Sequence, residues 1–341
     1  MQMAIVGSGA VGSVLAGHLL RGSGASLSLL ARGGHMRAIR EKGLVLRTGD
    51  ETWTGHPRVS DDPQALGPMD VILLTVKAHQ LPALAPTLPA MIGPKTLVVS
   101  IQNGLPWWYY FGSPCGAPDG PFQIVDPGAV IWNAIGPHRA IGGVISVGAD
   151  IVEPGVARHR GGPPDLTMGP PKAGAHAGPL ADLAGRMGAV GIAASVTDSI
   201  REPLWKKQQI AVAFGPAGVL TDAPLEPLQY FPGMAGLLSA AMHECLAVAR
   251  AAAVVLPDDI EARLSQPLGP PEHRPSMQQD FRAGKALELD ATLTAVIEIA
   301  ARHEVPVPTL ATLLPLVSLR VAQIRRQAPA GAPAAMDAPS T

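Results

Sequence analysis

Hydrophobic positions in about the first 200 residues follow two alternating periods. Short apolar runs such as "MAIVGSG", "LSLLAR", "DVILLTV" and "TLVVSIQNG" are separated by stretches with helical spacing, such as "VLAGHLLRGS". This alternation is typical of a parallel, doubly wound α/β sheet. Further on, "RAIGGVISVGADIVEPGVARHRGGPPDLTMG" predicts more strands with tight turns, and "ADLAGRMGAVGIAASV" predicts a last helix and strand.

From about Ser199 the pattern is helical throughout. It predicts helices over 203–214, 232–254, 276–303 and 309–326. We therefore expect an α/β domain over 1–198 and an all-helical domain over 199–327, with an active site in the crevice between them.

Two segments depart from this regular pattern. "PWWYYFGSPCGAPDGP" predicts a long loop or lid, although its aromatic side chains could instead be packed core. The last residues, 328–341, lack bulky apolar side chains and predict a disordered tail.

Composition narrows the class of protein. The formal net charge is −1 and the basic residues are scattered, which argues against nucleic acid or a membrane surface as partner. No uninterrupted apolar run reaches the ~18 residues of a membrane span, and no export signal precedes the first strand, so we expect a cytoplasmic protein. Cys115 and Cys245 lack metal-ligand spacing and suit a reducing compartment, so we expect no metal site.

A glycine-rich turn follows the first strand. In "MAIVGSGAVGSVLAGHLL", the pattern GxGxxG lies between a strand and a helix, the context of a dinucleotide-binding loop. The first glycine permits the tight turn, the second lets a pyrophosphate approach the backbone, and the third allows close helix packing. The residues expected to bind the cofactor here are Gly7, Ser8, Gly9, Ala10, Val11 and Gly12.

Arg32 follows the second strand at the position where NAD-preferring sites carry an acid that holds the ribose hydroxyls. A guanidinium there would pair with the 2′-phosphate of NADP, which makes NADP(H) the expected cofactor. The alternative is a solvated surface arginine. Two later strands also end in polar residues, at Lys77 and at Gln102-Asn103-Gly104. Their positions at the ligand-binding edge favour function over a solvated lysine and an ordinary turn.

Seven motifs, in their order and spacing here, resemble the ketopantoate reductases (2-dehydropantoate 2-reductases). They are "GSGAVG", "LLAR", "LTVKAHQ", "SIQNGLPWWYY", "EPGVARH", "IREPLWKK" and "PSMQQDFRAGKALELDA". The resemblance implies a Rossmann-type sheet followed by a helical domain like that of 6-phosphogluconate dehydrogenase. It also implies NADPH-dependent reduction of a small 2-keto acid, ketopantoate, to pantoate in the route to pantothenate and coenzyme A. A homodimer is compatible with this family.

The same resemblance assigns roles to individual residues. In the family's W-x-K pattern Trp205 fixes the register, so Lys207 matches the catalytic acid and Lys206 is expected to be solvated. Neighbouring residues on a helix point about 100° apart, so both lysines cannot face one site. Four further matches are Ser276 for the substrate carboxylate, Glu288 for the substrate hydroxyl, Asn103 between nicotinamide and substrate, and Lys77 beside the nicotinamide. A helix running through Ser276 and Glu288 would bring both near one face.

The sequence departs from the family pattern in that same helix. Ala211 and Gly215 replace two asparagines four and eight residues beyond the lysine, and Gln208 could reach partly into the gap. Pro275 also replaces a small polar residue beside the family serine. Missing amides would weaken discrimination for a hydroxylated substrate by about 1–3 kcal/mol each. Two alternatives therefore stay open: a related oxidoreductase for another keto or hydroxy compound, and a non-catalytic NADP(H)-binding protein.

Overall fold

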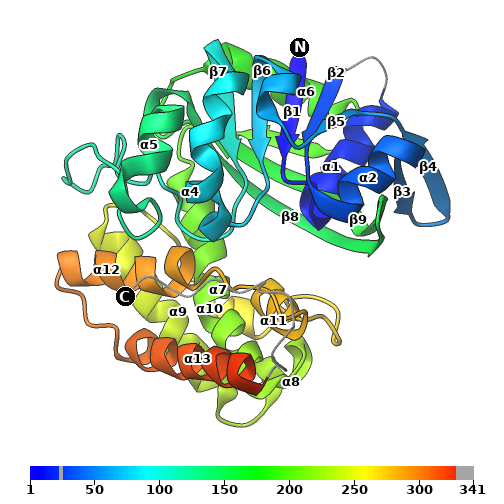
Figure 1. Ribbon diagram of the computed structural model, residues 1–341. Coiled ribbons are helices and arrows are strands. Elements are labelled where there is room, and N and C mark those ends of the chain that lie inside the picture. Colours follow the sequence, from blue (N-terminus) through cyan, green and yellow to red (C-terminus); the bar gives the residue numbers. More distant parts are fainter. Residues whose placement is uncertain (23–25, 328–341) are drawn as a thin grey trace. The chain divides into compact units, whose positions relative to one another are not determined.

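The computed structural model describes residues 1–22 and 26–327 (Figure 1). The predicted tail over 328–341 lies outside this range. The chain forms two compact units. Unit 1 contains 1–102, 106–113 and 118–200, and unit 2 contains 103–105, 114–117 and the chain from Arg201 onward.

Unit 1 is built on one sheet of ten strands in the order β4-β3-β9-β8-β7-β6-β1-β2-β5, with β10 paired to β9. Its strands are β1 (Gln2–Val6), β2 (Ser26–Leu30), β3 (Leu44–Thr48), β4 (Glu51–Gly55), β5 (Arg58–Ser60), β6 (Met69–Leu74), β7 (Ile92–Ser100), β8 (Ala140–Glu153), β9 (Val156–Gly169) and β10 (Ala193–Val196). Its α-helices are α1 (Ala10–Arg21), α2 (Gly33–Lys42), α3 (Pro63–Leu66), α4 (Leu81–Leu84), α5 (Val130–Ile135) and α6 (Ala177–Gly188).

The parallel part of this sheet has the doubly wound order that the sequence predicts. Adjacent strands within the run β5-β2-β1-β6-β7-β8 are parallel to one another, and the chain reverses its winding direction at β1. The last residues of four strands, Leu30, Val6, Leu74 and Ser100, are level with one another across the sheet. Residues that directly follow these strands therefore leave the sheet at one edge, where such folds bind ligands.

Two antiparallel pairings extend the sheet beyond what the alternating pattern predicted. Strands β8 and β9 form a long hairpin closed at Pro154 and Gly155. The sequence predicted strands and tight turns in this segment but not how the strands pair. Strands β3 and β4 form a second hairpin whose β3 strand pairs with β9. The sequence signal for this second hairpin is weak because its polar and exposed positions hide the strand periodicity.

The aromatic segment after β7 packs in the interior of unit 1 and is not a lid. Trp107, Trp108, Tyr109 and Tyr110 are each at most 5% exposed, and the indole nitrogen of Trp107 donates to Ser100 Oγ over 3.2 Å. Of the two alternatives that the sequence left open for these four residues, a lid and packed core, the structure confirms packed core, because burial of their large apolar surface outweighs the loop preference of the flanking prolines and glycines.

Unit 2 is helical, as the change of pattern at Ser199 predicts (Figure 1, yellow-green to red). Its helices are α7 (Arg201–Thr221), α8 (Leu225–Tyr230), α9 (Met234–Ala251), α10 (Ile260–Leu264), α11 (Ser276–Arg282), the π-helical turn η5 (Asp290–Thr294), α12 (Ala295–Arg302) and α13 (Pro308–Gln327). Helix α7 runs seven residues beyond its predicted end at 214, through Pro216. Its residues 212–219 are all buried, so packing overrides the local preference of glycine and proline to end the helix.

The predicted helix over 276–303 is wrong as a single element. Helix α11 ends at Arg282, where Gly284 has φ +65° and the amides of Lys285 and Gly284 donate to the carbonyls of Asp280 and Phe281. These two bonds form a Schellman cap, which ends a helix by placing a residue, usually glycine, in the left-handed region. Helical spacing continues across this break because both flanking segments bury one face.

Candidate active site

The glycine loop connects β1 to α1 at the carboxyl edge of the sheet. Gly7 has φ +103°, and an added Cβ there would lie 2.7 Å from the backbone nitrogen of Val76. An added Cβ on Gly12 would lie 2.1 Å from the Gly7 carbonyl oxygen. Neither position has room for a side chain, so both glycines are required by the fold.

Gly9 differs from its two neighbours in the motif. No atom lies within 4 Å of a Cβ built on Gly9, and the residue is exposed at the N-cap of α1. Its side of the loop is open, while the first turn of α1 carries no acidic residue. An open backbone at a helix N-terminus is the arrangement that accepts a pyrophosphate, so the loop fits a dinucleotide.

Thr75, which directly follows β6, holds this loop from beneath and is a residue that sequence reasoning missed. Its hydroxyl lies 2.6 Å from the Gly7 carbonyl oxygen and 3.2 Å from that of Val6, and its amide donates to Val6 over 2.9 Å. A threonine at a strand end gave no signal, because the loop it supports comes from residues 68 positions earlier in the chain.

Arg32 and Lys77 leave the sheet at the same edge as the loop. Arg32 is exposed, follows β2 and caps the N-terminus of α2. Lys77 is half-buried, and its amide is 3.3 Å from Gln80 Oε1. The structure thus brings the predicted cofactor residues of unit 1 to one side of the sheet.

In unit 2, the two lysines of α7 have different surroundings. Lys206 is exposed, its Nζ lies 3.8 Å from Asp259 Oδ2, and its carbonyl accepts from Arg263 over 3.4 Å. Lys207 is half-buried on the next position of the helix. Trp205, fully buried, anchors the first turn of α7. Lys206 therefore faces the segment of α10, and Lys207 points about 100° away from it.

Asn103 and Glu288 meet in unit 2 although 185 residues separate them. Asn103 Nδ2 donates to Glu288 Oε2 over 3.3 Å, and the Glu288 side chain is buried. The amide of Leu105 donates to the carbonyl of Ala291 over 2.7 Å, which fixes the segment 103–105 against η5. Two residues assigned separately to substrate are thus hydrogen-bonded partners.

Helix α7 is tied to the same segment through Gln208. Gln208 is buried, and its Nε2 donates to the carbonyl of Thr292 over 2.9 Å. The hydroxyl of Thr292 in turn donates to the carbonyl of Glu288 over 2.6 Å. The Gln208 amide nitrogen is therefore engaged by η5.

The second missing amide position is occupied by another side chain. A Cβ added to Gly215 would lie 3.2 Å from the sulfur of Met277 and 3.4 Å from its Cβ. Met277, on α11, is buried. An apolar thioether thus fills the space beside Gly215, at a position where the family has an asparagine.

Ser276 is exposed at the first residue of α11, directly after Pro275. Because α11 ends at Arg282, Ser276 and Glu288 do not lie on one continuous helix, and the predicted shared face is wrong. Ser276 reaches the neighbourhood of α7 through packing of its helix, since the next residue, Met277, contacts Gly215.

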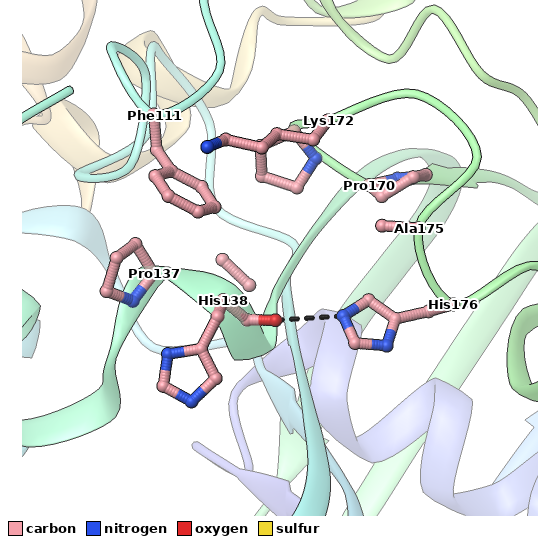
Figure 2. Close-up of a pocket in the computed structure, with 9 residues that line it drawn as sticks. Phe111, Pro137, His138, Pro170, Lys172, Ala175 and His176 are labelled. Atoms are coloured by element: carbon pink, nitrogen blue, oxygen red, sulfur yellow. Dashed lines mark hydrogen bonds between the residues drawn. The ribbon is translucent and has the colours of Figure 1, made fainter. Parts of the chain in front are cut away.

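A cavity of about 310 Å³ lies elsewhere in unit 1, and none of the predicted site residues lines it (Figure 2). At its wall the Lys172 amine lies 4.2 Å from the centre of the Phe111 ring and 3.0 Å from Asp119 Oδ2. His176 Nε2 donates to the carbonyl of His138 over 2.8 Å. These polar groups are paired with one another, and the remaining lining is largely proline and alanine.

A Rossmann-type unit with an open glycine loop, followed by an all-helical unit, fits the class of nicotinamide-dependent oxidoreductases acting on CH–OH and keto groups. Comparison with known proteins agrees. The family description "Ketopantoate reductase PanE/ApbA" matches residues 3–108, and its C-terminal counterpart matches residues 199–321. The chain belongs to the ketopantoate reductase family.

Individual relatives match over nearly their whole length. A 2-dehydropantoate 2-reductase of Mesorhizobium japonicum is 33% identical, covering 93% of this chain and 97% of the relative. The structure of a protein from Ralstonia solanacearum MolK2 assigned to the ketopantoate reductases has a TM-score of 0.88 and 34% identity, covering 95% and 98% of the two chains. D-mandelate dehydrogenase, solved with NADH and anilino(oxo)acetate, shares the fold at 20% identity, with a TM-score of 0.81 and coverage of 95% and 99%.

Within residues 1–22 and 26–327, no helix has both the length and the apolar character needed to cross a membrane.

Proposed function

We propose that the protein reduces a 2-keto acid with NADPH, and that ketopantoate is the substrate. The observation that carries this proposal is the hydrogen bond between Asn103 and Glu288. It unites two distant residues with matching family roles, and α7, which bears Lys207, is tied to the same η5 segment through Gln208.

In the proposed reaction, the cofactor and Lys207 have separate roles. The nicotinamide supplies the hydride to the carbonyl carbon when it is bound. Lys207 Nζ hands a proton to the carbonyl oxygen, so that the product is a neutral hydroxyl and the lysine regains its proton from solvent. Before transfer, the Lys207 ammonium stabilises the negative charge that develops on that oxygen.

Three other residues bind and orient the substrate in this proposal. Glu288 accepts a hydrogen bond from the substrate hydroxyl, and Asn103 positions the Glu288 carboxylate while facing the nicotinamide. Ser276 donates to the substrate carboxylate. Lys77, at the carboxyl edge of unit 1, lies beside the nicotinamide end of the cofactor.

The proposed preference for NADPH over NADH rests on Arg32. It is exposed immediately after β2, and no acidic residue occurs between Leu30 and Arg40, where an NAD-preferring loop would hold the ribose hydroxyls. A guanidinium is suited to bidentate pairing with a 2′-phosphate.

A second candidate substrate is a 2-keto acid with a less polar side chain. Ala211 and Gly215 offer no amide, and Met277 fills the space beside Gly215 with an apolar group. Anilino(oxo)acetate in the related fold of D-mandelate dehydrogenase is an oxo acid derivative of this less polar kind. Loss of two buried amides would move preference away from a hydroxylated substrate.

The test is NADPH oxidation, followed at 340 nm, with ketopantoate and four or five other 2-keto acids, and with NADH in parallel. The proposal requires turnover of ketopantoate that Lys207→Ala removes. Turnover of apolar keto acids without ketopantoate would favour the second candidate. Tight NADPH binding with no turnover on any acid would make the protein a nucleotide binder and end both proposals.

We also propose that the protein is located in the cytoplasm and forms a homodimer. The low cysteine content suits a reducing compartment. Cell fractionation tests the location, and the mass from light scattering, either one or two copies of the chain, tests the dimer.

A further inference from the structure

A chain of three hydrogen bonds links the glycine loop to the turn between β8 and β9. The amide of Gly155 donates to His35 Nδ1 over 3.0 Å. His35 Nε2 lies 3.1 Å from Ser13 Oγ, and Ser13 Oγ donates to the carbonyl of Ser8 over 3.0 Å. All four residues belong to unit 1. They come from four different places: Ser8 from the glycine loop, Ser13 from α1, His35 from α2 and Gly155 from the β8–β9 turn.

Only one arrangement of protons satisfies all three bonds. A backbone amide can only donate, so His35 Nδ1 must accept and carries no proton. The neutral ring then has its proton on Nε2 and donates to Ser13, whose own hydroxyl proton goes to the Ser8 carbonyl. The network therefore requires a neutral His35, because a proton on Nδ1 would face the Gly155 amide proton.

The bond to Ser8 acts on the part of the loop that faces a ligand. Ser8 and Gly9 share one planar peptide unit, in which the carbonyl oxygen and the amide proton point in opposite directions. Holding the Ser8 oxygen toward the fully buried Ser13 therefore turns the Gly9 amide the other way. The loop is open at Gly9, because no protein atom lies within 4 Å of a Cβ built on this residue.

We propose that Ser13 and His35 are positioning residues for the dinucleotide, which orient the Gly9 amide toward the pyrophosphate and release it when His35 becomes protonated. This inference rests on the proposed binding of NADP(H) at the loop. Under this proposal, cofactor affinity depends on pH through His35, which does not itself touch the cofactor.

Burial of His35 favours the neutral ring near pH 7. Burial lowers the pKa of His35 from its ordinary value. The charged residues near His35 in sequence are Arg32, directly before α2, and Arg37 and Arg40 on α2. Helix α1 has no charged residue between Ala10 and Gly17, and the glycine loop has none. In the β8–β9 hairpin, Glu153 lies 3.5 Å from Arg47 of β3.

The direction of the pH effect follows from this lowered pKa. The folded protein with an ordered loop binds fewer protons at His35 than an unfolded chain does. The contribution of neutral His35 to the stability of the ordered loop is fully present above the ordinary histidine pKa of about 6.5. It is lost as the pH falls through the lowered pKa that His35 has in the folded protein. Cofactor affinity should weaken in the same window.

The experiment is calorimetric titration with NADP⁺ and NAD⁺ between pH 5.5 and 8.5. NAD⁺ is included because the 2′-phosphate of NADP⁺ itself titrates near pH 6. The variants are Ser13→Ala, which cuts the network, and His35→Gln, whose amide can accept from Gly155 and donate to Ser13 without titrating. The matched control is His138→Gln, a histidine of unit 1 with a lowered pKa, just before the opposite end of β8 from Gly155.

We expect Ser13→Ala to weaken binding about three- to tenfold at pH 7.5, the value of one hydrogen bond. With NAD⁺, which has no titrating 2′-phosphate, His35→Gln should stay within about threefold of the wild type at pH 7.5 and bind equally well at pH 5.5, where the wild type and His138→Gln lose affinity. Melting curves check that each variant is folded.

If the wild type binds and the variants match it at every pH, this inference is overturned and the proposed function stands. If the wild type binds neither nucleotide, both fall. If Ser13→Ala does not fold, the difference between the wild-type and His35→Gln pH profiles decides alone, since a merely structural role would not make affinity independent of pH.

Discussion

In the glycine loop of unit 1 the groups offered to a ligand are backbone amides, whereas at the start of α7 in unit 2 they are side chains. The loop is shaped by Gly7 and Gly12, which have no space for a Cβ, and is held by Thr75. Beside α7, the geometry depends on hydrogen bonds between side chains and backbone, such as Asn103 to Glu288 and Gln208 to Thr292.

This difference decides how each region tolerates change. A backbone site survives most substitutions outside its glycines, because every residue except proline carries a backbone N–H. A side-chain site changes its specificity with each substitution. Here the replacement of two family asparagines by Ala211 and Gly215 leaves α7 intact, buried and helical. The two regions therefore predict different consequences for mutation.

The largest expected effect lies in the side-chain region. Lys207→Ala should lower kcat by about 10²–10⁴-fold, because it removes the proposed proton donor. Lys206→Ala is the matched control: it removes an exposed amine that lies 3.8 Å from Asp259, and kcat should stay within about twofold. Steady-state kinetics with both variants measures the difference. Equal losses in the two variants would remove Lys207 from its proposed role.

In the glycine loop, two glycine substitutions should separate an effect on folding from an effect on nucleotide binding. Gly12→Ala places a methyl group 2.1 Å from the Gly7 carbonyl oxygen and should destabilise the protein by about 1–3 kcal/mol. Gly9→Ala meets no protein atom within 4 Å, so its melting temperature should be unchanged while nucleotide affinity falls. Thermal melts and nucleotide titration of both variants test this. A destabilised Gly9→Ala with normal binding would contradict the open-face interpretation of the loop.

The preference for NADPH over NADH tests whether a side chain beside the glycine loop contributes to cofactor binding. Arg32→Gln should reduce the preference for NADPH over NADH by about 10–100-fold, since one charge-assisted contact to the 2′-phosphate is lost. Affinity for NADH should hardly change. The ratio of kcat/KM values for the two cofactors gives the result, with Arg37→Gln, a change of an exposed arginine on α2, as control. An unchanged ratio in Arg32→Gln would leave this residue an ordinary surface arginine.

The smallest expected effect concerns the support beneath the loop. Thr75→Val removes the hydroxyl bonded to Gly7 and should cost about 1 kcal/mol of unfolding free energy. Thr87→Val, which removes an exposed hydroxyl bonded locally to Leu84, should change stability by less than about 0.5 kcal/mol. Urea denaturation compares the two. If Thr87→Val costs as much as Thr75→Val, the support of the loop by Thr75 is no greater than a local bond.

The sequence predicted the regions whose structure depends on near neighbours in the chain. The strand, turn and helix around Gly7 to Gly12 lie within 21 residues, and each step has its own local signal. The strands and tight turns over 139–169 were also predicted from local signals, although their pairing was not. The family motifs added the candidate residues of unit 2, whose roles remain predictions.

The errors occurred where packing overrides local preference. The break after Arg282 depends on a cap at Gly284 that the continuing apolar spacing conceals. The sequence left open whether the aromatic segment 107–110 is a lid or core, and it is core because unit 1 supplies the surfaces that bury it. Thr75, Ser13 and His35 gave no signal, since their partners lie elsewhere in the sequence or are backbone atoms.

By itself, the sequence determined the family, the two-part architecture and the nucleotide loop, because periodicity and glycine placement act over a few residues. The tertiary structure alone decided that Glu288 meets Asn103, that Met277 fills the space beside Gly215, and that His35 reaches the loop through Ser13. These contacts join segments 22 to 185 residues apart. Hydrogen bonding and packing at such separations arise only once the elements have docked, and no local pattern encodes them.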